Sequence, residues 1–338
     1  MKLIVQIPCL NEENTLPQTV ADIPRQIEGI DQVEILIIDD GSTDRTVEVA
    51  REIGVDHVVR NLNNKGLAAS FRIGLDACLR LGADIIVNTD GDNQYQGRDI
   101  AKLVAPIVSG QADIVIGDRQ TDTIPHFDLH KKLLQKFGSA IVRVLSGAKI
   151  PDAVSGFRAF SRDAAMQLNI LTHYSYTVET ILQAGKRNLA VASVTVGTNP
   201  KTRESRLVRN IPSFVINQFN TMTRMYAMHQ PLRYFFIISL LIMLSGAVPM
   251  VRYFFFYIKG LGDGHIQSLI LGSVLLMIGF QVLVMGFIGD VISFNRRLIE
   301  EVLVRVKRIE IDHLAKAAPT MPLENSVQSP NQTETRNS

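Results

Sequence analysis

Two long apolar runs in the C-terminal third constrain this chain more than any other feature of its sequence. The first extends over Leu232–Ile258 and the second over Ile266–Phe294, with a polar, glycine-rich link over Lys259–His265 between them. Each run exceeds the roughly 20 residues that an α-helix needs to cross the hydrocarbon core of a membrane. We therefore predict a transmembrane hairpin. The alternative, two buried helices of a soluble domain, would require an unusually large core.

Basic residues flank this hairpin on both sides, whereas the link carries only one lysine beside one aspartate. The positive-inside rule then predicts that both termini lie in the cytoplasm and the link outside. The N-terminal sequence MKLIVQIPCLNEEN has too short an apolar run for a signal peptide and is typical of a first β-strand. We expect an integral protein of the plasma or inner membrane whose catalytic domain is cytosolic. The flanking basic residues are Arg203, Arg206, Arg209, Arg224 and Arg233, then Arg296, Arg297, Arg305, Lys307 and Arg308.

Before the hairpin, short apolar runs alternate with helical patterns. This alternation predicts an α/β fold with a mostly parallel sheet covered on both faces. The expected strands are Leu3–Ile7, Val33–Ile38, His57–Val59, Ile85–Thr89, Ile114–Gly117 and Ala190–Val196. The expected helices include Thr15–Ile27, Asp44–Ile53, Leu67–Leu81 and Arg98–Ser109.

The chain as a whole therefore divides into five segments by composition and periodicity. We expect a soluble α/β domain over residues 1–206, an interfacial amphipathic helix over 207–231 and the hairpin over 232–294. A juxtamembrane helix over 295–315 and a disordered polar tail over 316–338 complete the organisation.

Polar clusters follow five of the expected strands. Ligands bind beyond the carboxyl ends of the strands in open α/β sheets, so these clusters indicate one site rather than five unrelated turns. A turn followed by a helix cap is the alternative interpretation of each cluster taken alone. The clusters are PCLNEE from Pro8, DDGSTD from Asp39, NLNNKG from Asn61, DGDNQ from Asp90 and GDR from Gly117.

Asp90 and Asp92 are suited to a hard divalent cation, Mg²⁺ or Mn²⁺, which prefers carboxylates and shares its other positions with water and phosphate. Such a cation would neutralise a nucleoside diphosphate leaving group; helix capping without a metal is the alternative. The chain has neither a Walker A sequence nor GxGxxG, which disfavours P-loop and dinucleotide-binding proteins. A net charge of +2 predicts no nucleic-acid partner. The two cysteines lack CxxC spacing, and we expect buried reduced thiols.

The soluble part resembles the family 2 (GT-A) inverting glycosyltransferases, and more narrowly the polyprenyl-phosphate hexose transferases typified by dolichol-phosphate mannose synthase. The resemblance covers roughly residues 1–207 and agrees with the C-terminal hairpin. It rests on the segments IPCLNEEN, ILIIDDGSTDRT, NKGLAASFRIGL, NTDGDNQY, DAVSGFRAFSR and TRESRL.

The resemblance implies a role for individual residues. Those lining the nucleotide-sugar pocket would be Pro8, Asn11, Glu12, Asp40 (at the base), Lys65, Asp90 and, in a loop over the pyrophosphate, Arg203, Ser205 and Arg206. The metal ligands would be Asp90, Asp92 and Gln94, and the catalytic residues Asp92 and Asp152. The acceptor phosphate would meet Arg119, Lys131, Lys132 and Ser139.

The implied reaction is inverting transfer of a hexose from a UDP- or GDP-sugar to a polyprenyl phosphate, undecaprenyl or dolichyl. An acceptor phosphate is already nucleophilic, so Asp152 is better suited to orient the substrates than to remove a proton. The chain departs from its relatives where an Arg and a Ser bind the acceptor phosphate, because Lys131 and Gln135 stand near those positions. Lys131, Lys132 or Lys136 can supply the cation, and a lysine-rich helix on the membrane surface is a compatible interpretation.

Three other functions compete with this one. A processive polysaccharide synthase would carry a QxxRW motif, and the chain has no tryptophan. A family 2 transferase acting on another glycan or lipid-linked acceptor stays open. A non-enzymatic scaffold is disfavoured by the acidic and basic residues that the motifs retain. The sequence does not fix the donor base, and a homo-oligomer is compatible with it.

Overall fold

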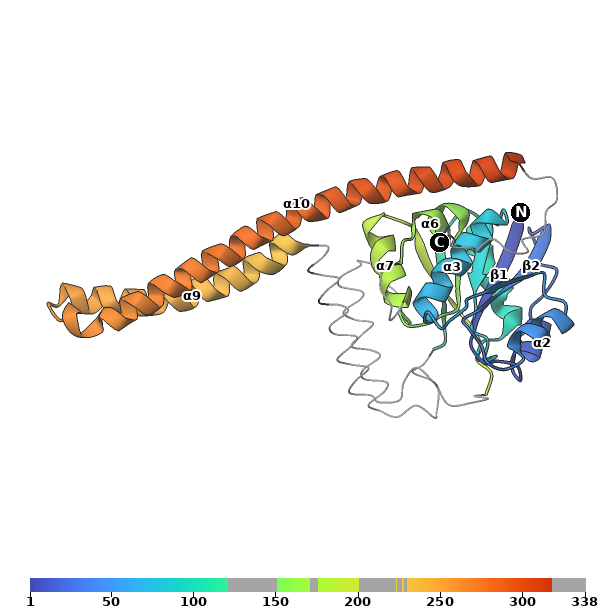
Figure 1. Cartoon of the computed structure of the whole chain (residues 1–338), viewed down its shortest axis with the longest axis horizontal. Helices are drawn as coiled ribbons and strands as arrows, with labels where there is room; N and C mark the ends of the chain where they lie inside the picture. Colours follow the sequence, from blue (N-terminus) through green and yellow to red (C-terminus); the bar gives the residue numbers. More distant parts are fainter. Residues whose placement is uncertain (121–150, 171–175, 201–222, 224–226, 228–229, 318–338) are drawn as a thin grey trace, which may run out of the picture.

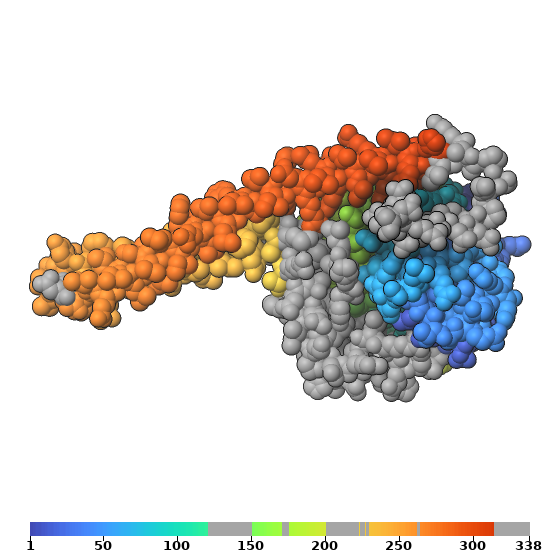
Figure 2. Space-filling model, in the orientation of Figure 1, coloured from blue at the N-terminus to red at the C-terminus, as the bar shows by residue number. Residues whose placement is uncertain are grey.

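The computed structural model describes residues 1–120, 151–170, 176–200, 223, 227 and 230–317. An α/β domain lies at one end, and a pair of long helices extends from it to the other end (Figure 1). The space-filling view shows the same elongated shape, with the helical pair projecting well beyond the domain (Figure 2).

A seven-stranded sheet forms the centre of the α/β domain, with the strand order β3-β2-β1-β4-β6-β5-β7. All pairings are parallel except those of β6, which runs antiparallel to both β4 and β5. The expected mostly parallel sheet is therefore confirmed. The strands are β1 (Lys2–Cys9), β2 (Gln32–Asp39), β3 (His57–Arg60), β4 (Ile85–Asn88), β5 (Ile114–Asp118), β6 (Arg158–Ser161) and β7 (Val191–Thr195).

Strand β6 was not predicted from the sequence. It has four residues, too few to show an alternating pattern, and its partners β4 and β5 lie at least 40 residues earlier in the chain. Long-range pairing rather than local propensity makes this segment a strand.

Helices cover both faces of the sheet, because successive residues of the buried strands point to opposite sides. Ile4 packs into the cluster with α3, α6 and α7, whereas Leu3 and Val5 pack into the cluster with α1, α2 and α4. The helices are α1 (Leu16–Ala21), α2 (Thr46–Glu52), α3 (Leu67–Arg80), α4 (Ile100–Val108) after the short η1 (Gly97–Asp99), α6 (Arg162–Gln167) and α7 (Tyr176–Lys186).

Helix α1 is shorter than predicted. It ends at Ala21, six residues before the expected Ile27. Pro24 explains the difference, because proline has no backbone N–H and disfavours helical geometry in the residue before it.

The long pair consists of α9 (Pro231–Ile258) and α10 (Ile266–Ala317), joined through η3 (Gly262–His265). Both are long and apolar enough to cross a membrane, and only 11% and 17% of their most apolar windows are buried. Such exposure disagrees with two core helices of a soluble domain. Helix α10 is continuous for 52 residues, so the expected second span and the expected juxtamembrane helix form one helix.

Small residues bring α9 and α10 close together. Gly272, Gly279 and Gly286 of α10 recur every seven residues on the side that faces α9. A Cβ added at Gly272 would lie 2.9 Å from the carbonyl oxygen of Gly246 in α9, so any larger residue would push the helices apart. This small-residue packing is typical of helices that associate in lipid.

The distal part of α10 lies against the α/β domain. Glu300 pairs with Arg187 at 3.2 Å, and Arg308 pairs with Asp163 at 3.0 Å. Ile311 is 6% exposed and belongs to the hydrophobic cluster that includes α3 and α7. The last turns of α10 therefore complete the core of the domain and fix its position relative to the hairpin.

Candidate active site

The loops after β1 and β2 are joined directly. The backbone N–H of Asn11 donates to Ser42 Oγ at 2.9 Å, and the backbone N–H of Thr43 donates to Asn11 Oδ1 at 2.8 Å. Asn11 takes a left-handed conformation with φ of 54°, which asparagine tolerates better than most residues. These contacts hold two of the predicted polar clusters together at one edge of the sheet.

Asp40 organises the loop after β3. The carboxylate is 5% exposed and accepts hydrogen bonds from Asn61 Nδ2 at 3.0 Å, from the backbone N–H of Lys65 at 2.9 Å and from that of Gly66 at 2.8 Å. The Lys65 side chain itself is exposed. Asp40 thus sets the shape of the pocket wall in which we expect a nucleotide base.

The loop after β4 lies against the start of the chain. The hydroxyl oxygens of Thr15 and Thr19 both lie within hydrogen-bond distance of the carbonyl oxygen of Gly91, at 2.8 and 3.2 Å. Thr15 Oγ1 also lies 2.8 Å from Glu12 Oε2, and Thr19 Oγ1 lies 3.0 Å from the carbonyl oxygen of Thr15. A Cβ at Gly91 would lie 3.4 Å from Glu12 Cγ and 3.5 Å from the carbonyl oxygen of Pro8. The predicted residues Pro8 and Glu12 therefore lie beside the glycine that separates Asp90 from Asp92.

Asp90 and Asp92 are both partly exposed at the carboxyl end of β4. Asp92 Oδ1 accepts a hydrogen bond from the backbone N–H of Gln94 at 3.1 Å, which stabilises the turn that carries both predicted metal ligands. Within the described residues, no three His, Cys, Asp or Glu side chains gather as a metal-binding group. Two partly exposed carboxylates nevertheless fit a hard cation whose remaining ligands are water and substrate phosphate.

Asp90 lies against Gly156, in the loop before β6. A Cβ at Gly156 would lie 3.2 Å from both carboxylate oxygens of Asp90 and 2.9 Å from the hydroxyl of Tyr176, so this position requires glycine. Burial, and then the negative charge of Asp90, raise the pKa of Tyr176. The tyrosine is therefore a neutral hydroxyl beside the carboxylate.

Asp152 and Arg119 form a buried pair. Arg119 Nε and Nη2 donate to the two carboxylate oxygens of Asp152 at 2.7 and 3.1 Å, and the side chains are 13% and 2% exposed. Burial acts to lower the pKa of Arg119, but Tyr95 and Asp152 outweigh it and the net pKa is raised. Two charge-assisted bonds hold the carboxylate of Asp152 in a fixed direction, as an orienting role would require.

Arg158 holds the segment that carries Asp152. Its side chain is fully buried and donates to the carbonyl oxygens of Ala153, Ser155 and Thr177 at 2.7–2.8 Å, and to the hydroxyl of Thr180. Burial lowers the pKa of Arg158 to about 10. The residue lies in the DAVSGFR motif, but no pattern in the sequence indicates that it faces the core.

A chain of hydrogen-bonded amides and one hydroxyl holds Gly156 and Tyr176, the two residues beside Asp90. Gln6 Nε2 donates to Asn88 Oδ1 at 2.9 Å, and Asn88 Nδ2 donates to the carbonyl oxygen of Gly156 at 2.9 Å and to the Tyr176 hydroxyl at 3.0 Å. Neither amide was predicted as a functional residue. Each interrupts an apolar strand and the two are direct neighbours in the β1–β4 register, a pattern that could have revealed them.

The structure thus brings together the predicted residues that follow β1, β2, β3, β4 and β5. Six predicted residues lie outside the described part of the chain, namely Lys131, Lys132, Ser139, Arg203, Ser205 and Arg206. Their assignment to the acceptor phosphate and to the pyrophosphate stays a prediction.

Comparison with known sequences connects this site to an enzyme family. A sequence model of glycosyl transferase family 2 matches residues 4–168. The chain is 30% identical over 213 residues to the UDP-N-acetylglucosamine–dolichyl-phosphate N-acetylglucosaminyltransferase of Methanococcus voltae, covering 57% of this chain and 83% of that one. It is 28% identical over 206 residues to the polyprenol monophosphomannose synthase of Mycolicibacterium smegmatis, covering 58% and 76%.

Among solved structures, the fold is similar to that of glucosyl-3-phosphoglycerate synthase from Mycobacterium tuberculosis, crystallised with Mn²⁺, UDP and glucosyl-3-phosphoglycerate. The TM-score is 0.52 with 19% sequence identity, and the match covers 67% of this chain and 79% of the other. At this identity the likeness concerns the fold alone, and it confirms the predicted GT-A architecture.

Proposed function

Because the chain belongs to glycosyl transferase family 2, we propose that it transfers a hexose from a UDP- or GDP-sugar to a polyprenyl phosphate, with inversion at the anomeric carbon. The observation that carries the proposal is one sheet edge that holds both groups. The carboxylate of Asp90 lies beside Gly156, Arg119 (paired with Asp152) lies over the Tyr95 ring, and the Gly156 N–H donates to the Tyr95 hydroxyl at 3.1 Å. Two relatives support the acceptor class. One is named for transfer to dolichyl phosphate, and the other for synthesis of polyprenol monophosphomannose.

The donor occupies the half of the site built by β1, β2 and β3. Asp40 shapes the base pocket, and Asn11, Glu12 and Pro8 line the wall between the base and the diphosphate. Arg203, Ser205 and Arg206, which lie outside the described residues, would contact the pyrophosphate. These groups position two anionic substrates, which is the main requirement of a transfer whose nucleophile is already ionised.

Asp90, Asp92 and Gln94 would hold a Mg²⁺ or Mn²⁺ ion. When bound, the ion neutralises the charge that develops on the departing nucleoside diphosphate. The solved neighbour crystallised with Mn²⁺ and UDP supports this assignment. Gly156 and Tyr176 lie beside the carboxylate of Asp90 and limit where it can lie.

The acceptor phosphate approaches on the side of β5 and β6. The Arg119–Asp152 pair uses two of the five N–H donors of the guanidinium, so the arginine keeps donors for a phosphate oxygen. Asp152 fixes the direction in which Arg119 presents them. Lys131, Lys132 and Ser139 add the remaining contacts, and no side chain is required to remove a proton from the acceptor.

The hairpin anchors this site to a membrane. Lys186 at the end of α7 lies near Arg296 and Arg297 of α10, and burial together with these two cations lowers the pKa of Lys186 to about 8. A basic cluster at the boundary of an apolar span is typical of the cytoplasmic side. We therefore place the catalytic domain and both termini in the cytosol, where a lipid phosphate can enter the site without leaving the bilayer.

Sugar transfer by membranes that contain the full-length protein tests this function. Membranes are incubated with radiolabelled UDP- and GDP-hexoses and either undecaprenyl or dolichyl phosphate, and lipid extracts are counted. We expect an acid-labile, alkali-stable labelled lipid that chelation by EDTA abolishes and added Mn²⁺ or Mg²⁺ restores. Asp92→Asn should lose the product, whereas Asp76→Asn on the exposed face of α3 should retain it.

Two results would contradict the proposal. Label that appears only in an oligosaccharide or a lipid-linked glycan, and not in a lipid monophosphate sugar, would identify the alternative family 2 activity. Absence of any labelled lipid from all donors, in membranes that contain folded protein, would reject sugar transfer to a polyprenyl phosphate.

A further inference from the structure

One face of α10 carries a continuous stripe of residues spaced alternately three and four apart. Every member of this stripe is exposed, and the apolar members include Ile299 at 68% and Ile309 at 69%. Spacing of three and four residues is the seam of a coiled coil, in which alternate positions pack against another helix. The stripe consists of Ile278, Gln281, Met285, Ile288, Ile292, Asn295, Ile299, Val302, Val306, Ile309 and His313.

A different face of α10 makes the contacts within the chain. Gly272, Gly279 and Gly286 face α9, and continuing the same seven-residue spacing leads to Glu300, which pairs with Arg187. One face of α10 therefore contacts α9 and then the α/β domain of the same chain. The stripe lies on another side, and within the described residues each of its members is exposed.

Lipid can cover only the part of the stripe that lies in the apolar span. Ile309 lies twelve residues beyond Arg297, which at the helical rise per residue is about 18 Å along the axis. Val302, Val306 and Ile309 thus stand outside the hydrocarbon region, in water. An exposed apolar row of this kind is typical of a protein–protein contact.

Gln281 provides an independent indication from inside the span. It lies near the middle of the apolar part of α10, belongs to the stripe and is exposed. A polar amide that faces lipid at mid-membrane is costly, and hydrogen bonding to a neighbouring helix relieves that cost. The same face therefore calls for a helical partner both inside and outside the membrane.

We propose that the stripe packs in parallel against the α10 stripe of a second copy of this chain. Two copies inserted with the same topology have parallel α10 helices. Their seams can then pack against each other over the full five heptads from Ile278 to His313. Gln281 then meets Gln281 of the second copy. Both α/β domains lie on the outer sides, because each is docked on a different face of its own helix.

Two pairs of residues beside the distal part of the seam match in this arrangement. In a parallel coiled coil, the residue before one core position meets the residue five positions later on the partner. Arg305 then meets Glu310 of the second copy, and Leu298 meets Leu303. Glu310 already pairs with Arg80 at 2.8 Å, so Arg305 joins an existing ionic contact.

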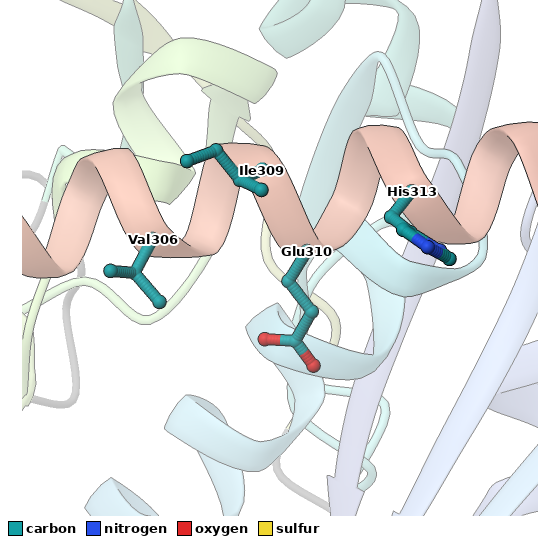
Figure 3. A pocket seen from close by; sticks show the side chains of 4 residues that line it. All are labelled: Val306, Ile309, Glu310 and His313. Carbon is teal, nitrogen blue, oxygen red and sulfur yellow. The ribbon is translucent and has the colours of Figure 1, made fainter.

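A shallow hollow lies at the distal end of the seam. Val306, Ile309, Glu310 and His313 line a pocket open to solvent on this helix (Figure 3). Three of these four residues belong to the stripe. The pocket gives a protruding residue of the second helix a place to insert.

Cysteine cross-linking of the full-length protein in membranes tests the proposal. Val302→Cys and Ile309→Cys place thiols in the seam, and Glu301→Cys is an exposed control one position away. The native Cys9 and Cys78 are buried, and burial raises the pKa of both thiols, so they do not interfere. Mild oxidation should link the seam variants to a species of twice the chain mass, and the control at least about tenfold less.

Sedimentation of the protein in nanodiscs or detergent gives a second measurement. Replacing both Val302 and Val306 by Lys should weaken self-association at least about tenfold, because charges would enter the apolar seam. Sugar transfer monitored in parallel shows that the variant is folded. Equal cross-linking of seam and control, a monomeric wild type, or a cross-link only to a different protein would overturn the proposal.

Discussion

Asp40 and Asp152 are both buried carboxylates at the same edge of the sheet, yet they are held in different ways. Asp40 accepts its hydrogen bonds from neutral groups, the amide of Asn61 and two backbone N–H groups. Asp152 faces the guanidinium of Arg119 and accepts two charge-assisted bonds from it. The proposed donor half of the site is therefore built from dipoles, and the proposed acceptor half from a buried ion pair.

This difference has consequences for each half. A carboxylate that neutral donors surround can be changed without leaving an unpaired charge behind. A carboxylate in a buried pair cannot, because removing it leaves a cation in a low-dielectric environment. The same Asp→Asn substitution should therefore reduce stability more at Asp152 than at Asp40.

The largest effect is expected for Asp152→Asn. The amide keeps the shape but leaves Arg119 without its counter-charge, which costs about 3 kcal/mol and lowers Tm by roughly 6–12 °C. Sugar transfer should fall at least about 100-fold, because the guanidinium loses its orientation. Thermal unfolding and sugar transfer by the purified full-length protein measure the two effects.

A double variant separates these effects. Asp152→Asn combined with Arg119→Met removes both charges, so most of the lost stability should return while activity stays low. Retention of the low Tm in the double variant would show that the pair is not the source of the destabilisation.

The next effect is expected for Arg158→Met. Three buried carbonyl oxygens lose their donor, which should cost about 2 kcal/mol and lower Tm by roughly 4–8 °C. Because Arg158 positions the Asp152 segment and does not touch the donor half, kcat should fall while KM for the nucleotide sugar changes little. Arg158→Lys should be intermediate. An unchanged kcat in folded Arg158→Met protein would contradict the positioning role.

The sequence indicated which residues meet beyond β1, β2 and β4 better than it indicated the contacts of β6 and α7. Asp40, Asn11 and Asp90 follow strands that each showed a continuous apolar run, so the topology of a parallel sheet was enough to bring them together. The Arg158 contacts and the Asn88–Tyr176 bond depend on β6 and α7, which join segments up to 88 residues apart. A chain pattern does not show which distant segment a polar residue will meet.

Helix α10 is a second feature whose extent a local pattern in the sequence does not show. Composition changes from apolar to charged near Arg296, which suggested two segments. Helical hydrogen bonding depends on the backbone and not on side-chain polarity, so the helix continues through the change. Its continuity places the catalytic domain relative to the hairpin, and hydropathy alone could not reveal it.

A smaller effect is expected for Asp40→Asn. The amide loses part of its acceptor capacity toward the 61–66 loop but leaves no buried charge, so stability should fall by about 1 kcal/mol. The KM for the nucleotide sugar should rise roughly tenfold with kcat nearly unchanged, because only the base pocket is altered. Asp31→Asn at the exposed start of β2 is the matched control. A loss of stability equal to that of Asp152→Asn would remove the distinction between the two halves.

The smallest effects are expected at Gly91, where two hydroxyls share one acceptor. Thr15→Val and Thr19→Val each keep the branched shape and remove one hydroxyl that lies within hydrogen-bond distance of the Gly91 carbonyl oxygen, and each should cost about 0.5–1 kcal/mol. The double variant should cost more than the sum, because the carbonyl then loses both hydroxyl donors. Thermal unfolding of the wild type, the two single variants and the double variant gives the coupling energy between the two hydroxyls. An additive result would mean that the two hydroxyls act separately, and that the loop carrying Asp90 and Asp92 is held by other contacts.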